Sequence, residues 1–307
     1  MVDGGGTKMR LRRCELSTPG SNEKMIEKAL GTAADVVFLD LEDAVAPNQK
    51  VEARGKVIQA LRSLNWGKKT RAIRMNNIET EYAYQDVIEV VEKAGEYLDL
   101  IIIPKVKAAR DVFWVDTLLT QIETRLKMKK KIALEVLIEE VQALINVEKI
   151  AKSSPRLEAI IFGPGDFSAS QGVRMTTIGG SVTTYPGDIW HYARSKIVVA
   201  ARAAGIDAID GPYADFRHPE GYREEATRSV TMGFTGKWAI HPSQIEIANE
   251  IYSPTKEEVD RARRLEDAYA KAEKEGLGAI TFDGVMIDAA SVRIIRNVIE
   301  KANLIGM

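Results

Sequence analysis

The chain has 307 residues, a net charge of −1 and 45% hydrophobic residues. It can therefore bury a large core, and it carries no overall field that would recruit nucleic acid or an anionic membrane. Its single cysteine, Cys14, excludes an internal disulfide. No apolar run approaches the roughly 20 residues of a membrane span, and residues 1–8 lack the apolar stretch of a signal peptide. We expect a soluble, cytoplasmic protein without nucleic-acid or membrane partners.

Short apolar segments alternate with longer amphipathic segments along most of the chain. The predicted strands are 13–17, 36–41, 71–75, 100–106, 132–138, 159–162, 208–211 and 237–240. The predicted helices that follow them are 22–30, 48–64, 81–93, 109–128, 141–152, 188–204, 220–232 and 242–251. Near-continuous apolar strands are typical of parallel sheets that are covered on both faces. Eight such units favour a TIM (β/α)8 barrel over an open doubly wound sheet, and no G-x-G-x-x-G motif follows the first strand.

Two segments break this alternation. Residues 168–187 form a polar, Gly- and Thr-rich stretch that we expect to be a functional loop. After the eighth unit come a charged helix over 255–276, a connecting segment over 277–288 and a last helix over 289–302. We therefore predict a flexible terminus at 1–11, a barrel at 12–252 and a C-terminal helical extension at 253–307 that acts as a lid or an oligomer contact.

Ionisable side chains follow seven of the predicted strands, at the end of the barrel where active sites lie. A single residue of this kind would indicate a helix cap or a stabilising ion pair, but so many together indicate a functional site. The residues are Asp40, Glu42, Asp43, Arg74, Lys105, Glu139, Glu140, Asp166, Asp210 and His241.

A hard metal site is the first candidate on this rim. Glu139 and Asp166 follow neighbouring strands, and two carboxylates without a nearby Cys or His cluster favour an oxygen-preferring cation such as Mg²⁺. Glu140 is the alternative ligand to Glu139, and Glu139 could instead be a solvated helix start. Gly163 and Gly165 would let the backbone approach a ligand closely.

Arg74 directly follows an apolar strand, so its guanidinium is held at the rim, where it could grip a carboxylate in a bidentate manner. The alternative for Arg74 is a structural ion pair with Glu42 or Asp43. For Lys105 we favour the structural ion pair. His241 has no Ser or Cys partner and is interpreted as a ligand contact or a core hydrogen bonder, and Cys14 as a packing residue.

Motifs along the chain resemble those of the family of citrate lyase β-subunits and malyl-CoA lyases. They are RCELSTPGS (13–21), FLDLEDAV (38–45), IRMN (73–76), IPKV (103–106), EVLIE (135–139), FGPGDF (162–167), AIHPSQ (239–244) and FDGVMID (282–288). The resemblance covers residues 12–304. IDGP (209–212) and GKWAIHPSQ (236–244) look most similar to the malyl-CoA lyase branch.

The resemblance implies a TIM barrel with a C-terminal extension that assembles as a homotrimer or homohexamer. It implies Mg²⁺, with Mn²⁺ as a substitute, on Glu139 and Asp166. It also implies that Arg74 and the backbone at Gly165 and Asp166 hold a keto-acid carboxylate. The catalytic acid/base would be Asp288, delivered by a neighbouring subunit. The implied coenzyme A contacts are Ser17, Asn22, Lys28, Ile240 and His241.

The activity implied by the resemblance is reversible cleavage of (S)-malyl-CoA to acetyl-CoA and glyoxylate, together with cleavage of β-methylmalyl-CoA to propionyl-CoA and glyoxylate. Citramalyl-CoA cleavage and malyl-CoA hydrolysis would use the same site. Two further alternatives stay open at this point. One is a CoA-independent, metal-dependent pyruvate aldolase, and the other is a non-catalytic barrel that serves as an assembly subunit.

Overall fold

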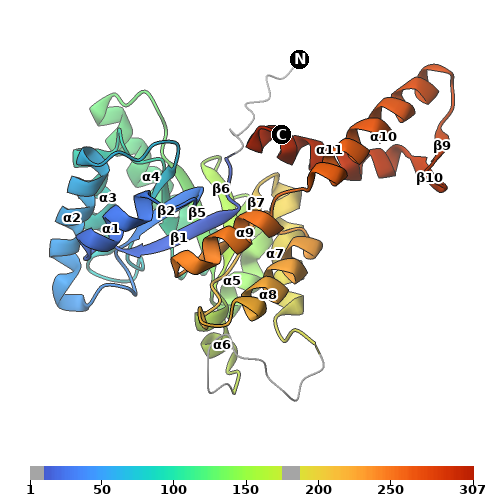
Figure 1. The fold of residues 1–307 in the computed structure, drawn as a ribbon. Helices are drawn as coiled ribbons and strands as arrows, with labels where there is room; N and C mark the ends of the chain where they lie inside the picture. The colour runs from blue at the N-terminus through green and yellow to red at the C-terminus, as the bar shows by residue number, and fades with distance from the viewer. Residues whose placement is uncertain (1–9, 175–186) are drawn as a thin grey trace. The chain divides into compact units, whose positions relative to one another are not determined.

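A computed structural model describes residues 10–174 and 187–307 of the chain. Eight parallel strands close into one barrel, in which β1 pairs with both β2 and β8 (Figure 1). The strands are β1 Cys14–Pro19, β2 Val36–Asp40, β3 Thr70–Arg74, β4 Leu100–Ile103, β5 Ala133–Ile138, β6 Leu157–Phe162, β7 Asp207–Asp210 and β8 Gly236–Ala239. The predicted TIM barrel is confirmed, and the predicted strands agree with these bounds to within about three residues.

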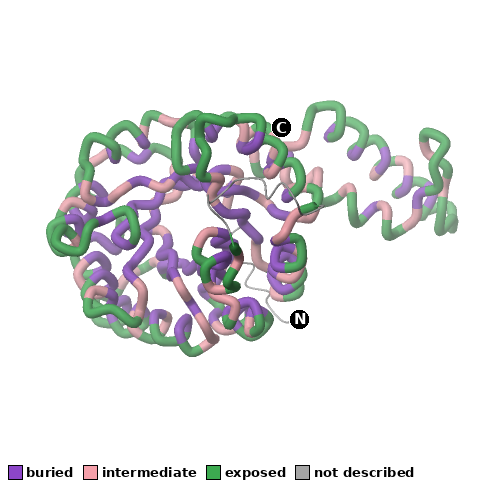
Figure 2. Tube along the Cα trace, turned by 90° about the horizontal axis from the view of Figure 1, so that it is seen from below, coloured by how far each residue is buried: buried purple, intermediate pink, exposed green. Residues whose placement is uncertain are grey.

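Helices follow the strands and cover the outside of the barrel. They are α1 Glu23–Leu30, α2 Lys50–Ser63, α3 Ala83–Ala94, α4 Ala109–Leu126, α5 Val141–Ala151, α6 Pro164–Gln171, α7 His191–Ala204, α8 Pro219–Met232 and α9 Ile245–Ile251. Short 3₁₀ turns, η1 Pro47–Gln49 and η2 Pro242–Gln244, precede α2 and α9. In Figure 2 buried residues line the strands and the helix faces turned toward them, while exposed residues lie outside.

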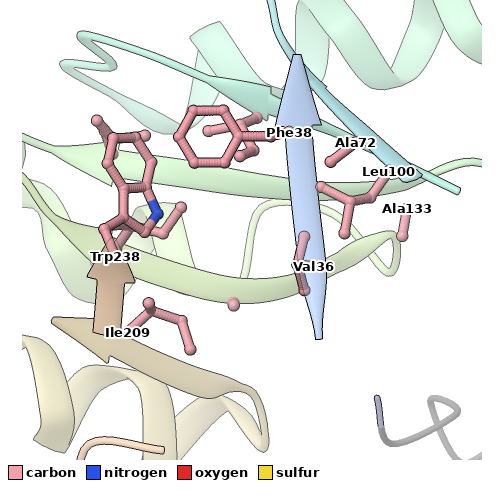
Figure 3. Close-up of a cluster of buried hydrophobic side chains, with 11 residues drawn as sticks. Val36, Phe38, Ala72, Leu100, Ala133, Ile209 and Trp238 are labelled. Atoms are coloured by element: carbon pink, nitrogen blue, oxygen red, sulfur yellow. The ribbon is translucent and has the colours of Figure 1, made fainter. Parts of the chain in front are cut away.

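The barrel interior is filled by residues at every second position of the strands, because successive strand side chains point to opposite faces. Phe38 of β2 and Trp238 of β8 lie side by side there, with ring centroids 4.5 Å apart (Figure 3). Burying an aromatic or large aliphatic side chain of this kind stabilises the fold by about 1.5–3 kcal/mol. The buried interior cluster comprises Val36, Phe38, Ala72, Leu100, Ile102, Ala133, Leu137, Ala159, Ile161, Ile209 and Trp238.

Part of the predicted loop at 168–187 is helical. Ser168 to Gln171 belong to α6, which begins at Pro164 and ends at Gly172, a glycine with φ of 72°. The loop prediction is therefore wrong for these four residues. Proline at a first helical position and glycine at the end are ordinary helix signals. Residues 175–186 lie outside the described part of the chain.

The chain divides into two compact units. One is Arg12–Asn249, which contains the barrel, and the other includes Glu250–Met307. The second unit holds α10 Lys256–Lys274, β9 Ala279–Phe282, β10 Val285–Asp288 and α11 Ala289–Ile305. Its own small core contains Leu265, Tyr269, Ile287 and Val292.

The sequence pattern assigns no secondary structure to 277–288, but β9 and β10 form an antiparallel hairpin there. Asp283 and Gly284 make its turn with φ of 50° and 77°. An Asp-Gly pair with two positive φ angles is a strong hairpin signal, and the alternating apolar residues around it could have revealed the hairpin. Within residues 10–174 and 187–307, no helix combines the length and the apolar character that crossing a membrane requires.

Candidate active site

The polar rim of the barrel follows from the alternation of the strand residues. Asp40, Arg74 and Glu139 each come two residues after an interior core residue, namely Phe38, Ala72 and Leu137. Since the strand period is two residues, these three polar side chains point to the same inner side as the core. They therefore meet at the carboxyl ends of β2, β3 and β5, where barrel active sites are built.

Arg74 is held in place by carboxylates from β2 and the loop after it. Its Nε and Nη2 donate to the two oxygens of Asp40 at 2.8 and 2.5 Å, and Nη1 lies 3.1 Å from Glu42 Oε2. The guanidinium also lies over the ring of Trp238, 5.6 Å from its centroid. Although burial opposes the charge, ion pairing with Asp40 raises the pKa of Arg74, so it stays cationic. The ion pairs considered for Arg74 are present, with Glu42 at 3.1 Å and Asp43 at 3.7 Å, but its main partner is Asp40, which was not predicted.

Glu139 is a buried carboxylate with only 2% of its surface exposed. Its Oε1 accepts a hydrogen bond from the backbone N–H of Lys105 at 2.7 Å. A Cβ atom at position 163 would lie 2.6 Å from the Glu139 Cβ and 2.9 Å from its Oε2, so glycine is required there. Burial raises the pKa of Glu139 to about 8 against the opposing charge of Arg74, and Asp166 adds to the rise.

Glu139 and Asp166 fit a hard divalent cation. Asp166 lies in the first turn of α6 with its side chain half exposed. No hydrogen bond to Glu139 Oε2 is recorded from the described residues. Within the described ranges no three His, Cys, Asp or Glu side chains are grouped to hold a metal. A cation here would therefore use two carboxylates and complete its shell with water or substrate oxygens, which is the usual pattern for Mg²⁺.

Glu140 is turned away from this pair. It precedes α5, and its Oε2 accepts a hydrogen bond from Ser170 on α6 at 2.8 Å. Of the two adjacent glutamates, Glu139 is therefore the one that shares the inner side of the barrel with Arg74.

Lys105 and Lys50 cross-link the loops around the site. Lys105 Nζ donates to Glu42 Oε1 at 2.5 Å and to Asp43 at 3.1 Å, which matches the predicted structural ion pair. Lys50 Nζ donates to the carbonyl oxygens of Leu41 and Glu42 and to Asn76. Sequence reasoning missed this role of Lys50, because nothing along the chain shows that the start of α2 returns to the end of β2.

Asp210 does not belong to the rim, contrary to the prediction. It follows the interior residue Ile209 by one position, so the alternation turns it outward toward the helices. There it is fully buried, and it accepts hydrogen bonds from Lys237 at 2.7 Å and from Arg194 at 3.0 Å. The same counting of positions could have excluded Asp210 from the site.

Three of the residues expected to contact coenzyme A, Ser17, Ile240 and His241, lie toward the ends of β1 and β8, which are neighbours because Leu16 pairs with Ala239. The other two, Asn22 and Lys28, belong to α1. Ser17 and Ile240 follow these two residues, and Ile240 is 39% exposed. Asn22 caps α1 by accepting a hydrogen bond from the Met25 N–H at 3.1 Å. Lys28 is exposed in the last turn of α1.

His241 is exposed at the end of β8, so it is not a core residue. Its ring stacks on Phe216 with centroids 4.6 Å apart, and its Nδ1 lies 2.8 Å from Ser243 Oγ. Cys14 is fully buried in β1, in agreement with a packing role, and burial raises the pKa of its thiol.

Asp288 lies in the C-terminal unit as the cap of α11. Its Oδ1 accepts hydrogen bonds from the Ser291 N–H at 2.9 Å and from Ser291 Oγ at 3.0 Å. These bonds, led by the one from the backbone, hold the pKa of Asp288 below its ordinary value. The carboxylate is thus charged and oriented at the start of a helix.

A family model described as HpcH/HpaI aldolase/citrate lyase matches residues 13–242. The chain belongs to this family. The match spans β1 to the turn after β8, so it includes the barrel and every rim residue described above. The C-terminal unit lies beyond it.

Curated relatives in the HpcH/HpaI aldolase/citrate lyase family extend over the whole chain. The L-malyl-CoA/beta-methylmalyl-CoA lyase of Rhodobacter capsulatus is 44% identical, and the match covers 96% of each chain. The (3S)-malyl-CoA thioesterase of Cereibacter sphaeroides is 34% identical and covers 96% of this chain and 95% of the relative.

Solved structures confirm the fold. A citrate lyase from Burkholderia xenovorans superposes with a TM-score of 0.86 at 22% identity, covering 98% of this chain and 94% of that one. Protein CitE from Mycobacterium tuberculosis, in complex with magnesium, acetoacetate and coenzyme A, gives a TM-score of 0.73 at 26% identity and covers 94% of this chain and 97% of its own.

Proposed function

We propose that this chain is a magnesium-dependent carbon–carbon lyase that reversibly cleaves (S)-malyl-CoA to acetyl-CoA and glyoxylate, and β-methylmalyl-CoA to propionyl-CoA and glyoxylate. The observation that supports the proposal is a buried carboxylate, Glu139, at the barrel mouth, whose charge interacts with those of Arg74 and Asp166. The 44% identity to a lyase named for both thioesters supports the substrate class, and the magnesium complex of the Mycobacterium protein supports the metal.

Glu139 and Asp166 would hold the metal. The fit rests on Glu139 Oε2, to which none of the described residues donates a hydrogen bond, and on the all-oxygen donor set. A bound Mg²⁺ would polarise the carbonyl of the keto acid as a Lewis acid. Mn²⁺ accepts the same oxygen ligands and can replace it. Burial favours the protonated form of Glu139. This proton must leave before the carboxylate can bind the cation.

Arg74 supplies the positive charge that orients the anionic substrate. Asp40 holds its Nε and Nη2, so the guanidinium does not reorganise when the substrate binds. We propose that Arg74, together with the backbone at Gly165 and Asp166, binds the carboxylate of the keto acid. Charge that develops on the thioester oxygen during the reaction would also be stabilised by Arg74.

Asp288 is the proposed acid/base. In the direction of condensation it would take a proton from the acetyl-CoA methyl group, and in cleavage it would return that proton to the same carbon. We place it in the site of a neighbouring subunit of a homotrimer or homohexamer. Its hydrogen bonds with Ser291 would aim the carboxylate, and desolvation on closure would raise its basicity from the lowered value of the free protein.

Coenzyme A is proposed to lie across the adjacent ends of β1 and β8. Ser17 and Ile240 lie at that edge through the pairing of Leu16 with Ala239. Lys28 offers a cation for a phosphate group, and Asn22 keeps its amide N–H donors while its oxygen caps α1. His241 provides an exposed ring next to Ile240.

The test is an assay of metal-stripped protein with acetyl-CoA or propionyl-CoA and either glyoxylate or pyruvate, before and after Mg²⁺ is added. We expect Mg²⁺-dependent formation of the hydroxyacyl thioester with glyoxylate, and cleavage of that product in the reverse assay. Preference for pyruvate would indicate citramalyl-CoA cleavage. Net release of free CoA thiol would indicate a thioesterase. Aldol chemistry on pyruvate without CoA would indicate an aldolase, and the absence of any turnover would indicate a non-catalytic barrel.

A further inference from the structure

Lys105 has an unusual backbone conformation at the end of β4. Among the described residues, three that are not glycine have positive φ angles, namely Lys105, Lys127 and Asp283. Lys127 ends α4 and Asp283 lies in the hairpin turn, where such angles are ordinary. Lys105, with φ of 50°, is at neither kind of position. A side chain other than glycine is disfavoured there, so other contacts must maintain the conformation.

The backbone of Lys105 contacts the proposed metal ligand directly. Its N–H donates to Glu139 Oε1 at 2.7 Å, which joins the ends of the neighbouring strands β4 and β5. On the other side, the absence of a side chain at Gly163 makes room for Glu139 Oε2. One oxygen of the carboxylate is thus fixed by Lys105, and the other lies against Gly163, three residues before Asp166.

The side chain of Lys105 supplies contacts that can maintain this conformation. Its ammonium group donates to Glu42 and to Asp43 in the loop after β2, and it lies 3.9 Å from Asp166. A single residue therefore reaches Glu139 through its backbone and the β2 loop through its side chain. Glu42 in turn contacts Arg74.

We propose that Lys105 is a positioning residue whose left-handed backbone aims Glu139 at the cation, with its ammonium group anchoring that backbone to Glu42 and Asp43. The inference rests on the proposed metal site. It assigns Lys105 a role in ligand orientation beyond that of a structural ion pair. Hydrogen bonds to the far oxygen of a metal-binding carboxylate fix its orientation and raise metal affinity.

Substitutions at Lys105 can distinguish the effect of its backbone conformation from the effect of its ammonium charge. Lys105→Gly and Lys105→Asn remove the charge and tolerate positive φ, whereas the β-branched Lys105→Val removes the charge and disfavours positive φ. Titration calorimetry on metal-stripped protein measures Mg²⁺ affinity without requiring turnover. We expect Val to weaken Mg²⁺ binding about 10–100-fold and Gly and Asn to weaken it less than about tenfold.

Lys107→Val is the matched control, since Lys107 lies two residues further along and pairs with Glu79 at the surface. It should bind Mg²⁺ like the wild type. Lys105→Thr, which is also β-branched, replaces the Val variant if thermal melting shows that the latter is unfolded. Equal affinities for Val (or Thr), Gly and Asn would overturn the backbone assignment. No Mg²⁺ binding by the wild-type protein would instead refute the proposed metal site itself.

Discussion

Arg74 and Asp40 form a bidentate ion pair between the neighbouring strands β3 and β2, in register with each other in the barrel sheet. Asp40 also accepts the N–H groups of Glu42 and Ala44, so the same carboxylate shapes the loop after β2. The pair thus connects Arg74, which would hold the substrate, to the loop after β2, which Lys105 and Lys50 also contact.

Removing Asp40 should destabilise the protein strongly. Asp40→Ala leaves the buried guanidinium of Arg74 with reduced compensation, and breaking a buried pair in this way costs about 3–5 kcal/mol. Urea unfolding measures the loss. Glu79→Ala breaks the more exposed pair with Lys107 and should cost at most about 1 kcal/mol. Similar losses for the two variants would show that the Asp40 pair is not the anchor of the rim.

Mg²⁺ binding should strengthen as the pH rises toward about 8, the pKa of Glu139 in the metal-free protein. Because the cation needs the charged carboxylate, at pH 7 the proton lowers apparent affinity about tenfold relative to a fully ionised Glu139. Calorimetry in buffers of different ionisation enthalpy would detect the proton released on binding. Glu139→Gln should abolish binding. Constant wild-type affinity from about pH 6 to about pH 9 would argue against Glu139 as a ligand.

The contribution of Glu139 to the stability of the metal-free protein should fall as the pH rises, whereas Mg²⁺ binding strengthens. The pKa of Glu139 is higher in the folded state than its ordinary value of 4.5, so the folded state binds more protons between those two values. Its contribution to stability is therefore present below pH 4.5 and is lost as the pH rises through about 8. The difference in free energy of unfolding between wild type and Glu139→Gln, followed across this range, isolates the effect. A difference independent of pH would contradict it.

Asp288→Asn should lose turnover while keeping its fold. Asparagine caps helices as well as aspartate does, so α11 should be preserved, but the amide cannot accept the proton. We expect kcat to fall about 10²–10⁴-fold with CoA thioester and Mg²⁺ binding unchanged. Ser291→Ala removes the two hydrogen bonds of the hydroxyl group but keeps the Asp288 carboxylate and its bond from the Ser291 N–H, so it should retain most activity. Near-normal turnover by the Asn variant would show that Asp288 serves only as a cap.

Lys237→Met should destabilise the barrel without affecting the metal site. Lys237 is fully buried and bonds to Asp210, Glu225 and the Gly211 carbonyl. Its removal leaves those carboxylates with Arg194 but without the lysine charge, and breaking the buried pair should cost about 3–5 kcal/mol by thermal or urea unfolding. Mg²⁺ affinity, measured below the unfolding transition, should stay at the wild-type value. A large loss of affinity would return Asp210 and its partners to the functional rim.

Periodicity along the chain was sufficient to predict the barrel, because its parallel strands are nearly continuously apolar and its helices are amphipathic. The same two-residue alternation that buries Phe38, Ala72 and Leu137 also turns Asp40, Arg74 and Glu139 inward. Applied to Ile209, it would have turned Asp210 outward. The Asp283-Gly284 pair is likewise a local turn signal for the hairpin.

Local patterns of two and about 3.6 residues along the chain are therefore enough to specify the fold and the types of side chain that gather at one end of the barrel. Which of these side chains bond to one another depends on contacts that form only in the folded protein. The pairing of Arg74 with Asp40, the contact of the Lys105 N–H with Glu139, and the choice of Glu139 over Glu140 depend on strands and loops that are distant in the chain. The raised pKa of Glu139 likewise arises from burial, which exists only once the barrel has closed around it.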